Sequence, residues 1–309
     1  MTTISHKFVT RPDRPVDTFL LDILRRVDAV AHELGIEYFV GGALARDLIL
    51  SHIFGKDTGR ATRDVDLGIC IDDWSQLEAL RMRLIESEYF AVQPSVTHRL
   101  IYRPVGNTFG IPLDLLPFGG VEHSDQTIAW PPGMDIVMNV AGFAEARTSA
   151  LMVEITDNFA VPVTSLPSLA ILKLIAWRDR HLETSKDATD FLLIARHYTD
   201  AGNVDRLYET ESPLLQAVDF DPDLAGAMLL GKDAAAVCGD STSKAVTGIL
   251  LDAALKSILI DQLLRSTLSS GEDAAKSRVE QFIEAFLDGF SDAGVESHSK
   301  LSHLGNKSR

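Results

Sequence analysis

The sequence is poor in cysteine, in basic side chains and in long apolar runs. Its 309 residues include two cysteines, Cys70 and Cys238, too few for a disulfide framework or a zinc site built from cysteines. Aspartate and glutamate number 44 against 29 lysines and arginines, which gives a formal net charge of −15. A protein that coats nucleic acid needs many basic side chains to neutralise phosphates, so the composition excludes such a coat. It still allows a small phosphate ligand bound through a metal.

No apolar run approaches the roughly 20 residues that cross a bilayer. The first residues lack the apolar stretch of a signal peptide, and two cysteines are in keeping with reduced thiols. We therefore expect a cytoplasmic protein with no membrane partner. The chain length suits two domains, since domains usually have about 100–200 residues.

Two kinds of pattern divide the chain near residue 165. Strand-like runs alternate with helical periodicity over residues 16–165, which predicts a mixed sheet flanked by helices. Helical patterns, one of them spanning 241–268, predict a helical domain over residues 166–290. The polar residues 291–309 are expected to form a flexible tail. A long loop is expected at 117–135, where glycine, proline and aspartate are frequent.

The first candidate motif is Val40-Gly41-Gly42, which ends a strand-like run immediately before a helical pattern. Glycine lets the backbone approach a ligand closely, and the free N–H groups at the start of a helix can bind phosphate oxygens. The same pair of glycines is also compatible with an ordinary strand-to-helix turn.

The second motif is Asp64-Val65-Asp66-Leu67. Side chains at i and i+2 of a strand point to the same face, so Asp64 and Asp66 share one face and the apolar residues share the other. Two neighbouring carboxylates repel each other unless a cation lies between them, and such oxygen ligands suit Mg²⁺. A solvated acidic strand edge is the alternative.

The third motif is Leu113-Asp114-Leu115, a single carboxylate inside an apolar strand. Burying a lone carboxylate is costly unless it is paired or binds a metal, although Asp114 can also face solvent from a half-exposed strand. A phosphate-binding turn, a carboxylate pair and a third carboxylate on a neighbouring strand are together the components of a two-metal phosphoryl-transfer site.

In this order the three motifs resemble the signature of the DNA polymerase β-type nucleotidyltransferase superfamily: hG[GS], then h[DE]h[DE]h, then h[DE]h, where h is hydrophobic. The resemblance implies an α+β fold, with a polymerase β-like nucleotidyltransferase core followed by a helical domain. It implies transfer of an NMP from ATP or another NTP to an acceptor hydroxyl, with two Mg²⁺ or Mn²⁺ ions held by Asp64, Asp66 and Asp114. Gly41 and Gly42 would contact the triphosphate. The family often has serine at the position of Gly42, and that hydroxyl contact is missing here.

Residues 166–198 are similar to the later motifs of the AbiEii-like nucleotidyltransferases, the toxins of type IV toxin–antitoxin systems. That pattern has a lysine on a helix, an arginine a few residues later and a [KR]D-x-x-D start to the next helix. The matching residues are Lys173, Arg178 or Arg180, and Lys186-Asp187 with Asp190. The resemblance implies that Lys173 contacts the triphosphate and that Asp187 helps to position it. The implied catalytic set is Asp64, Asp66, Asp114 and Lys173.

The residues of this helical region also have structural alternatives. Lys173 interrupts an apolar helix face, and its long stem can carry the ammonium to solvent from a half-buried position. Acidic residues in the first turn of a helix, such as Asp187 and Asp190, are expected from the helix dipole alone.

The resemblance also implies partners: the 3′ end of an RNA such as tRNA as acceptor, and a cognate antitoxin protein, in a toxin–antitoxin or phage-defence system. Three alternatives stay open. They are an antibiotic-type adenylyltransferase acting on a protein or small molecule, a CCA-adding or poly(A)-like polymerase, and a non-catalytic nucleotide-binding module. The polymerase alternative rests on Gly41-Gly42 followed by Arg46-Asp47, which has one residue more than the G-G-x-x-R-D opening of those enzymes.

Further residues near the motifs are candidates for substrate contacts. Five arginines can bind the triphosphate or the acceptor backbone, or balance the acidic site: Arg46, Arg60, Arg63, Arg99 and Arg103. The predicted nucleotide-binding set is Gly41, Gly42, Arg46, Lys173 and Asp187. His98 can face the cleft, and Trp130-Pro131-Pro132-Gly133 can form a lid, an acceptor-binding element or a packed loop.

Overall fold

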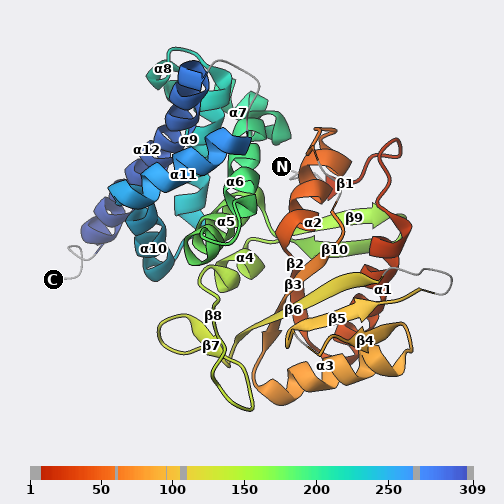
Figure 1. The fold of residues 1–309 in the computed structure, drawn as a ribbon. Coiled ribbons are helices and arrows are strands. Elements are labelled where there is room, and N and C mark those ends of the chain that lie inside the picture. The colour runs from red at the N-terminus through yellow and green to blue at the C-terminus, as the bar shows by residue number, and fades with distance from the viewer. Residues whose placement is uncertain (1–7, 60–61, 95, 105–109, 267–271, 305–309) are drawn as a thin grey trace. The chain divides into compact units, whose positions relative to one another are not determined.

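An eight-stranded mixed sheet is the framework of the N-terminal part of the chain in the computed structural model (Figure 1). The structure describes residues 8–59, 62–94, 96–104, 110–266 and 272–304. The chain forms two compact units, residues 1–165 and 166–309. The strand order is β1-β9-β10-β2-β3-β6-β5-β4. The bounds are β1 (Phe8–Val9), β2 (Glu37–Val40), β3 (Val65–Ile71), β4 (Phe90–Val92), β5 (Arg99–Tyr102), β6 (Ile111–Gly119), β9 (Leu151–Thr156) and β10 (Phe159–Val163).

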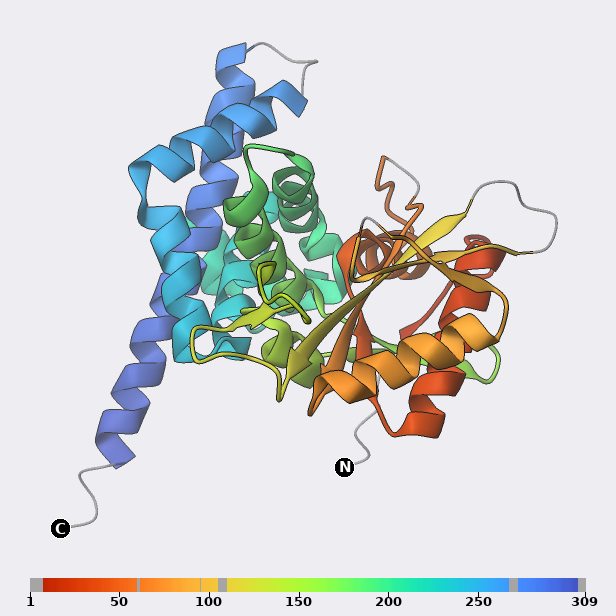
Figure 2. The same ribbon diagram turned by 60° about the horizontal axis from the view of Figure 1, so that its bottom comes forward.

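Helices cover both faces of this sheet. They are α1 (Thr18–Leu34), α2 (Gly42–Asp47), which continues into the π-helical turn η1 (Leu48–Ile53), α3 (Trp74–Glu86) and α4 (Phe143–Thr148). Asp17 begins α1 by accepting hydrogen bonds from the N–H groups of Phe19 and Leu20, and Gly35 ends it in the left-handed conformation, with φ +65°. α1 and α3 contact each other and lie on the same face of the sheet (Figure 2).

The central strand β3 has the alternation that the sequence predicts. Val65, Leu67 and Ile69 are buried, whereas Asp66 on the opposite face is half-buried. On the face of Asp66, a Cβ at Gly68 would lie 2.3 Å from the Phe39 ring, so only glycine leaves room for that ring. Phe39 packs there against the rings of Phe118 and Phe143, with ring centroids 5.7–5.9 Å apart. This aromatic cluster anchors α4 on the carboxylate-bearing face.

The region predicted as a loop at 117–135 contains regular structure, so that prediction was wrong in part. β6 continues through Pro117 to Gly119, and β7 (Thr127–Ala129) pairs with β8 (Val137–Asn139). Pro117 is tolerated because it lacks only the N–H that would point away from β3. In a strand, the N–H groups of residues 115 and 117 point to the same side. The Leu115 N–H points away from β3 and donates to the His98 carbonyl. In the described part, β5 pairs with β6 only over residues 111–114, so the strand pairing on that side ends before Pro117.

The second unit is a bundle of helices (Figure 1). Its elements are α5 (Leu166–Arg180), α6 (Lys186–His197), the π-helical turn η2 (Thr199–Asn203), α7 (Val204–Tyr208), α8 (Ser212–Ala217), α9 (Pro222–Val237), α10 (Asp240–Leu251), α11 (Ala253–Ser266) and α12 (Glu272–Leu304). The pattern at 241–268 is two helices, because Asp252 has an extended backbone and its carboxylate caps α11 through the N–H groups of Ala254 and Leu255.

Close packing of α9 and α12 depends on two glycines. A Cβ at Gly231 would lie 2.0 Å from the Phe286 carbonyl oxygen, and one at Gly289 would lie 1.9 Å from the Met228 carbonyl oxygen. Because both contacts are with backbone, neither helix can accept a side chain there without moving apart. α12 is described as far as Leu304, whereas the sequence pattern ends its helix near residue 290 and assigns 291–309 to a tail; residues 305–309 lie outside the described part.

The predicted α+β class, a mixed sheet flanked by helices and followed by helices, is confirmed. Within the described part of the chain, no helix has both the length and the hydropathy needed to cross a membrane.

Replacing Gly289 by alanine tests the contact between α9 and α12. We expect Gly289→Ala to lower the free energy of unfolding by about 1–3 kcal/mol, because overpacking forces the two backbones apart. The matched control is Gly248→Ala in α10, where a Cβ meets nothing within 4 Å. That variant should be neutral or more stable by up to about 1 kcal/mol, since alanine favours helix. Thermal and urea unfolding measure both; equal effects of the two variants would contradict this packing.

Candidate active site

The turn between β2 and α2 places backbone directly against a carboxylate. The Gly41 N–H donates to the Asp66 carbonyl at 2.8 Å, and Gly42 has φ +60°, a conformation that favours glycine. A Cβ at Gly42 would lie 1.8 Å from Asp66 Oδ2. Both the backbone conformation and this close approach therefore require glycine at 42. This explains why the serine frequent at this position in the resembled superfamily is absent here.

The three predicted carboxylates converge because of strand pairing. β3 and β6 are parallel, and their register sets Asp66 beside Asp114 on one face of the sheet. Cα atoms on adjacent strands are about 5 Å apart, so two negative charges are held side by side. Asp64 precedes β3 by one residue. All three carboxylates raise the pKa of Arg99, first through its hydrogen bond with Asp114 and then through the charges of Asp114, Asp66 and Asp64.

Arg99 is the cation at the centre of this cluster. Its Nε donates to Asp114 Oδ1 at 2.6 Å and its Nη2 donates to Oδ2 at 2.7 Å, the two-pronged geometry that guanidinium forms with carboxylate. Asp114 is only 6% exposed, so this pairing is what makes its burial tolerable. His98 Nε2 lies 3.8 Å from Asp114 Oδ2, and burial lowers the pKa of His98 against the opposing effect of the Asp114 charge. Arg99, not His98, therefore carries the balancing charge at pH 7.

The three carboxylates supply the kind of oxygen ligand that a divalent cation prefers, and strand register brings Asp66 beside Asp114. In this structure, however, the side chains are arranged around Arg99. Asp66 and Asp114 are hard oxygen donors on neighbouring strands, and Asp64 adds a third. Across the described ranges, no group of three or more His, Cys, Asp or Glu side chains is gathered tightly enough to hold a metal ion in this arrangement. Asp114 would have to exchange its contact with Arg99 for a metal ion.

The other predicted arginines lie in different environments. Arg46 is 1% exposed, and its Nε and Nη2 contact Asp47 Oδ1 at 2.8 and 2.6 Å. The second carboxylate oxygen of Asp47 accepts a hydrogen bond from Thr62. Arg46 is therefore a buried residue of α2 that is paired with its neighbour Asp47. Arg63 and Arg103 are exposed, and Arg60 lies outside the described residues.

In the helical unit, Lys173 is enclosed by acidic side chains. Lys173, on α5, is 8% exposed, and its Nζ lies 3.1 Å from Asp187 Oδ1 and 2.8 Å from Asp190 Oδ2, both on α6. Arg180 joins the same carboxylate, with Nε 2.6 Å from Asp187 Oδ2. The alternative of a lysine that extends to solvent is therefore wrong, because its ammonium is held between two buried aspartates.

This four-residue ionic cluster, Lys173, Arg180, Asp187 and Asp190, is formally neutral. Burial acts to raise the pKa of Asp187, but the hydrogen bond from Arg180 and the charge of Lys173 act more strongly together, and its pKa is lowered overall. The Arg180 side chain is 53% exposed. The charge that the cluster presents to solvent is thus that of Arg180, a residue that the sequence pattern offered only as one of two arginines.

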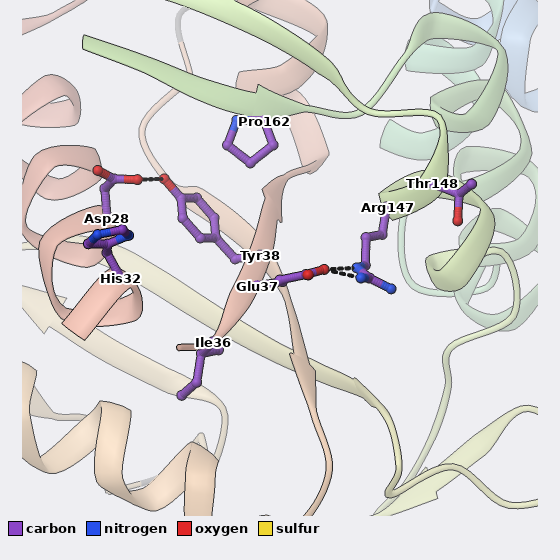
Figure 3. A pocket seen from close by; sticks show the side chains of 8 residues that line it. All are labelled: Asp28, His32, Ile36, Glu37, Tyr38, Arg147, Thr148 and Pro162. Carbon is purple, nitrogen blue, oxygen red and sulfur yellow. Dashed lines mark hydrogen bonds and ion pairs between the residues drawn. The ribbon is translucent and has the colours of Figure 1, made fainter. Parts of the chain in front are cut away.

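A cavity of about 500 Å³ lies at the other end of β2 from Gly41 (Figure 3). Its acidic side chains already have partners: Arg147 contacts Glu37, and the Tyr38 hydroxyl donates to Asp28 at 2.8 Å. Burial is the main cause that raises the pKa of Tyr38. Residues of the three motifs do not line this cavity. The converging carboxylates therefore favour the Gly41-Gly42 end of β2 over this cavity as the candidate active site.

A comparison with protein families decides the identity of this arrangement. The model described as "Nucleotidyl transferase AbiEii toxin, Type IV TA system" matches residues 22–227, well over half of the chain and all of the motifs above. The chain belongs to the AbiEii nucleotidyltransferase family. The predicted nucleotidyltransferase of the AbiEii type is thereby confirmed.

Solved structures similar to this AbiEii family member are distant. ANT(2″)-Ia in complex with adenylyl-2″-tobramycin has 16% identity and a TM-score of 0.36, over 58% of this chain and 88% of that one. A nucleotidyltransferase-like protein from Paracoccidioides brasiliensis has 18% identity and a TM-score of 0.39, over 66% and 93%. CdnC of E. coli MS115-1, in its complex with HORMA-deltaN, has 12% identity and a TM-score of 0.32, over 90% and 94%. These scores carry no conclusion on substrate or partner. No curated protein matches the chain.

Replacing Arg99 tests whether the carboxylate of Asp114 needs a neighbouring cation. We expect Arg99→Gln to lower the free energy of unfolding by about 1–3 kcal/mol without metal, because Asp114 loses its partner. Added Mg²⁺ should then raise the melting temperature of Arg99→Gln more than that of the wild type, since the freed carboxylates bind it. Arg83→Gln, which breaks an exposed ion pair with Glu33, is the control. An equal Mg²⁺ response in all three proteins would argue against metal binding at Asp114.

The lowered pKa of Asp187 predicts a pH dependence. Its contribution to stability is complete above the unfolded-state pKa of about 4 and is lost as the pH falls through the lower pKa of the folded state. We expect Asp187→Asn to cost about 3–5 kcal/mol at pH 7, because two cations lose a buried partner. The difference from wild type should shrink as the pH falls below about 4. Urea unfolding at pH 7 and pH 3 measures it, with the exposed Asp179→Asn as control; a difference independent of pH would contradict the assignment.

Proposed function

We propose that this nucleotidyltransferase transfers an NMP from an NTP to the 3′ hydroxyl of an RNA, most plainly a tRNA, in a Mg²⁺-dependent reaction. The acceptor oxygen bonds to the α-phosphorus, the bond from the α-phosphorus to the bridging oxygen of the β-phosphate breaks, and pyrophosphate leaves. The proton of the acceptor hydroxyl passes to a carboxylate oxygen of Asp114. Family membership supports NMP transfer in general, and the acceptor and the metal are the proposed parts.

One observation carries this proposal: strand register sets Asp66 beside Asp114, with Asp64 near enough to act on the same guanidinium. A cluster of like charges on one face needs a cation, and an NTP arrives with Mg²⁺. Two Mg²⁺, or Mn²⁺ in their place, would be held by Asp64, Asp66 and Asp114 and would neutralise charge on the phosphates. The Gly41-Gly42 backbone would contact the triphosphate through its N–H groups, and its contact with Asp66 supports this role by setting the turn next to a proposed metal ligand.

Arg99 and Arg46 have different proposed roles at this site. Arg99 holds Asp114 in place until substrate binds, and its guanidinium then becomes available to a phosphate. Arg46 was predicted to contact the nucleotide, but its burial against Asp47 supports a positioning role within α2, the helix that begins at Gly42.

In the helical unit, we propose that Lys173 and Arg180 contact the triphosphate and that Asp187 positions both. Support comes from the shared carboxylate: Asp187 bonds to Lys173 and to Arg180 at once, which fixes the directions of two cations. A cation fixed before the reaction stabilises developing phosphate charge without reorganising. We place the enzyme in the cytoplasm, as the toxin of a toxin–antitoxin pair neutralised by a cognate antitoxin protein.

The proposal is tested by incubating the enzyme with each labelled NTP, Mg²⁺ and total RNA. We expect label in RNA with wild type, and a loss of about 10²–10³-fold in rate with Asp66→Asn or Asp114→Asn, because each removes charge stabilisation made at the reacting phosphate. Asp157→Asn, in the exposed β9–β10 turn, should retain the wild-type rate.

Separate outcomes contradict separate parts of the proposal. Equal labelling by wild type and Asp66→Asn would remove the carboxylates from the reaction. Label in protein or in a small molecule, with none in RNA, would leave NMP transfer in place and overturn the RNA acceptor. Full activity in EDTA would overturn the metal.

A further inference from the structure

A second pocket of the N-terminal unit is built from aromatic rings and one buried cation. It has a volume of about 400 Å³ and lies where the start of α3 meets the segment after β7. Trp74, Leu77, Glu78 and Arg81 of α3 line one side, and Thr97 and Trp130 line the other. No residue of the three sequence motifs lines this pocket. It includes Trp130, for which the sequence left three roles open: part of a lid, part of an acceptor-binding element, or loop packing.

The rings form a row that leads from the pocket to the active site. Trp74 and Trp130 have centroids 5.3 Å apart, and Trp130 and His98 have centroids 5.9 Å apart. His98 in turn lies 3.8 Å from Asp114. Trp130 is 4% exposed and fixed by its neighbours, whereas Trp74 is half-buried and leaves part of its indole open. Trp74 therefore offers an indole surface on which a planar ligand can stack, and the row of rings connects this surface to Asp114.

Arg81 gives the pocket its polarity. Its Nη1 donates to the Thr97 carbonyl at 2.9 Å, and its Nε lies 3.8 Å from Glu78, an exposed carboxylate. The Arg81 side chain is largely buried, so its cation has little water around it and a distant counter-charge. A guanidinium in this setting favours a ligand with a phosphate or with acceptor atoms on a flat edge. An aromatic face next to such a cation is the combination that proteins use for single-stranded RNA.

We propose that this pocket binds a nucleobase of the acceptor RNA, stacked on Trp74 with its edge or phosphate on Arg81. The proposal rests on the proposed function in taking RNA as the acceptor. The strand order indicates that this base belongs to the acceptor RNA and not to the NTP. The strands follow the order β2-β3-β6-β5 (Figure 1), and the Gly41-Gly42 turn comes after β2. His98 precedes β5 and lies 3.8 Å from Asp114 on β6, so the row of rings is on the Asp114 side. The base in this pocket belongs to a nucleotide upstream of the reacting 3′ end.

Two measurements on the same variants test this assignment. The first is fluorescence anisotropy of a labelled single-stranded RNA tetranucleotide with Mg²⁺ and without NTP, which does not need the reaction to occur. Trp74→Ala should weaken binding by about 10- to 100-fold, the usual effect of losing one base–aromatic stack. Trp74→Phe should keep most of the affinity. Tyr208→Ala, which removes a 62%-exposed aromatic side chain on α7, should have no effect.

The second measurement is steady-state kinetics of labelling. Trp74→Ala should raise the KM for RNA by a similar factor and leave the KM for NTP unchanged. A raised KM for NTP with an unchanged KM for RNA would assign the pocket to the base of the NTP and overturn the proposal. Unchanged tetranucleotide binding by a folded Trp74→Ala protein would also overturn it. If wild type labels no RNA while Trp74→Ala still loses tetranucleotide binding, the proposed reaction fails and the RNA-binding pocket stands.

Discussion

The pairing of β3 with β6 is the constraint on which the proposed active site depends. Parallel register fixes the backbone of Asp66 beside that of Asp114, so the two carboxylates extend from neighbouring positions on one face of the sheet. The sheet therefore holds two negative charges at one point of its surface, where a positive charge stabilises them. Arg99 supplies this positive charge in the structure described here, and Mg²⁺ that accompanies an NTP can supply it during the reaction.

Other features of the N-terminal unit follow from the same crowding. Glycine is required at 42 because the backbone there has φ +60° and lies against the Asp66 carboxylate. His98 continues the chain of contacts from Asp114 to Trp130. In the helical unit, Asp187 and Asp190 enclose Lys173, and Arg180 completes a formally neutral cluster, so that the buried charges are balanced within the unit itself.

Features set by local pattern were predictable from the sequence, and features set by pairing were not. The alternation of acidic and apolar residues from Asp64 predicted a strand with one acidic face. The bond between Arg99 and Asp114 joins strands 15 residues apart, so it required the register. Burial of Arg46 against its neighbour Asp47 required the tertiary fold. Asp252, which divides the predicted helix at 241–268, was a readable N-cap signal that hydrophobic periodicity alone concealed.

The most direct test of the central claim is a crystal structure of the enzyme with Mn²⁺ and a non-hydrolysable NTP, with the metal located by its anomalous scattering. The account predicts anomalous density in contact with Asp66 and Asp114, with the Arg99 guanidinium released from Asp114. Manganese at another place on the chain, with the Arg99–Asp114 pair intact beside a bound NTP, would contradict it.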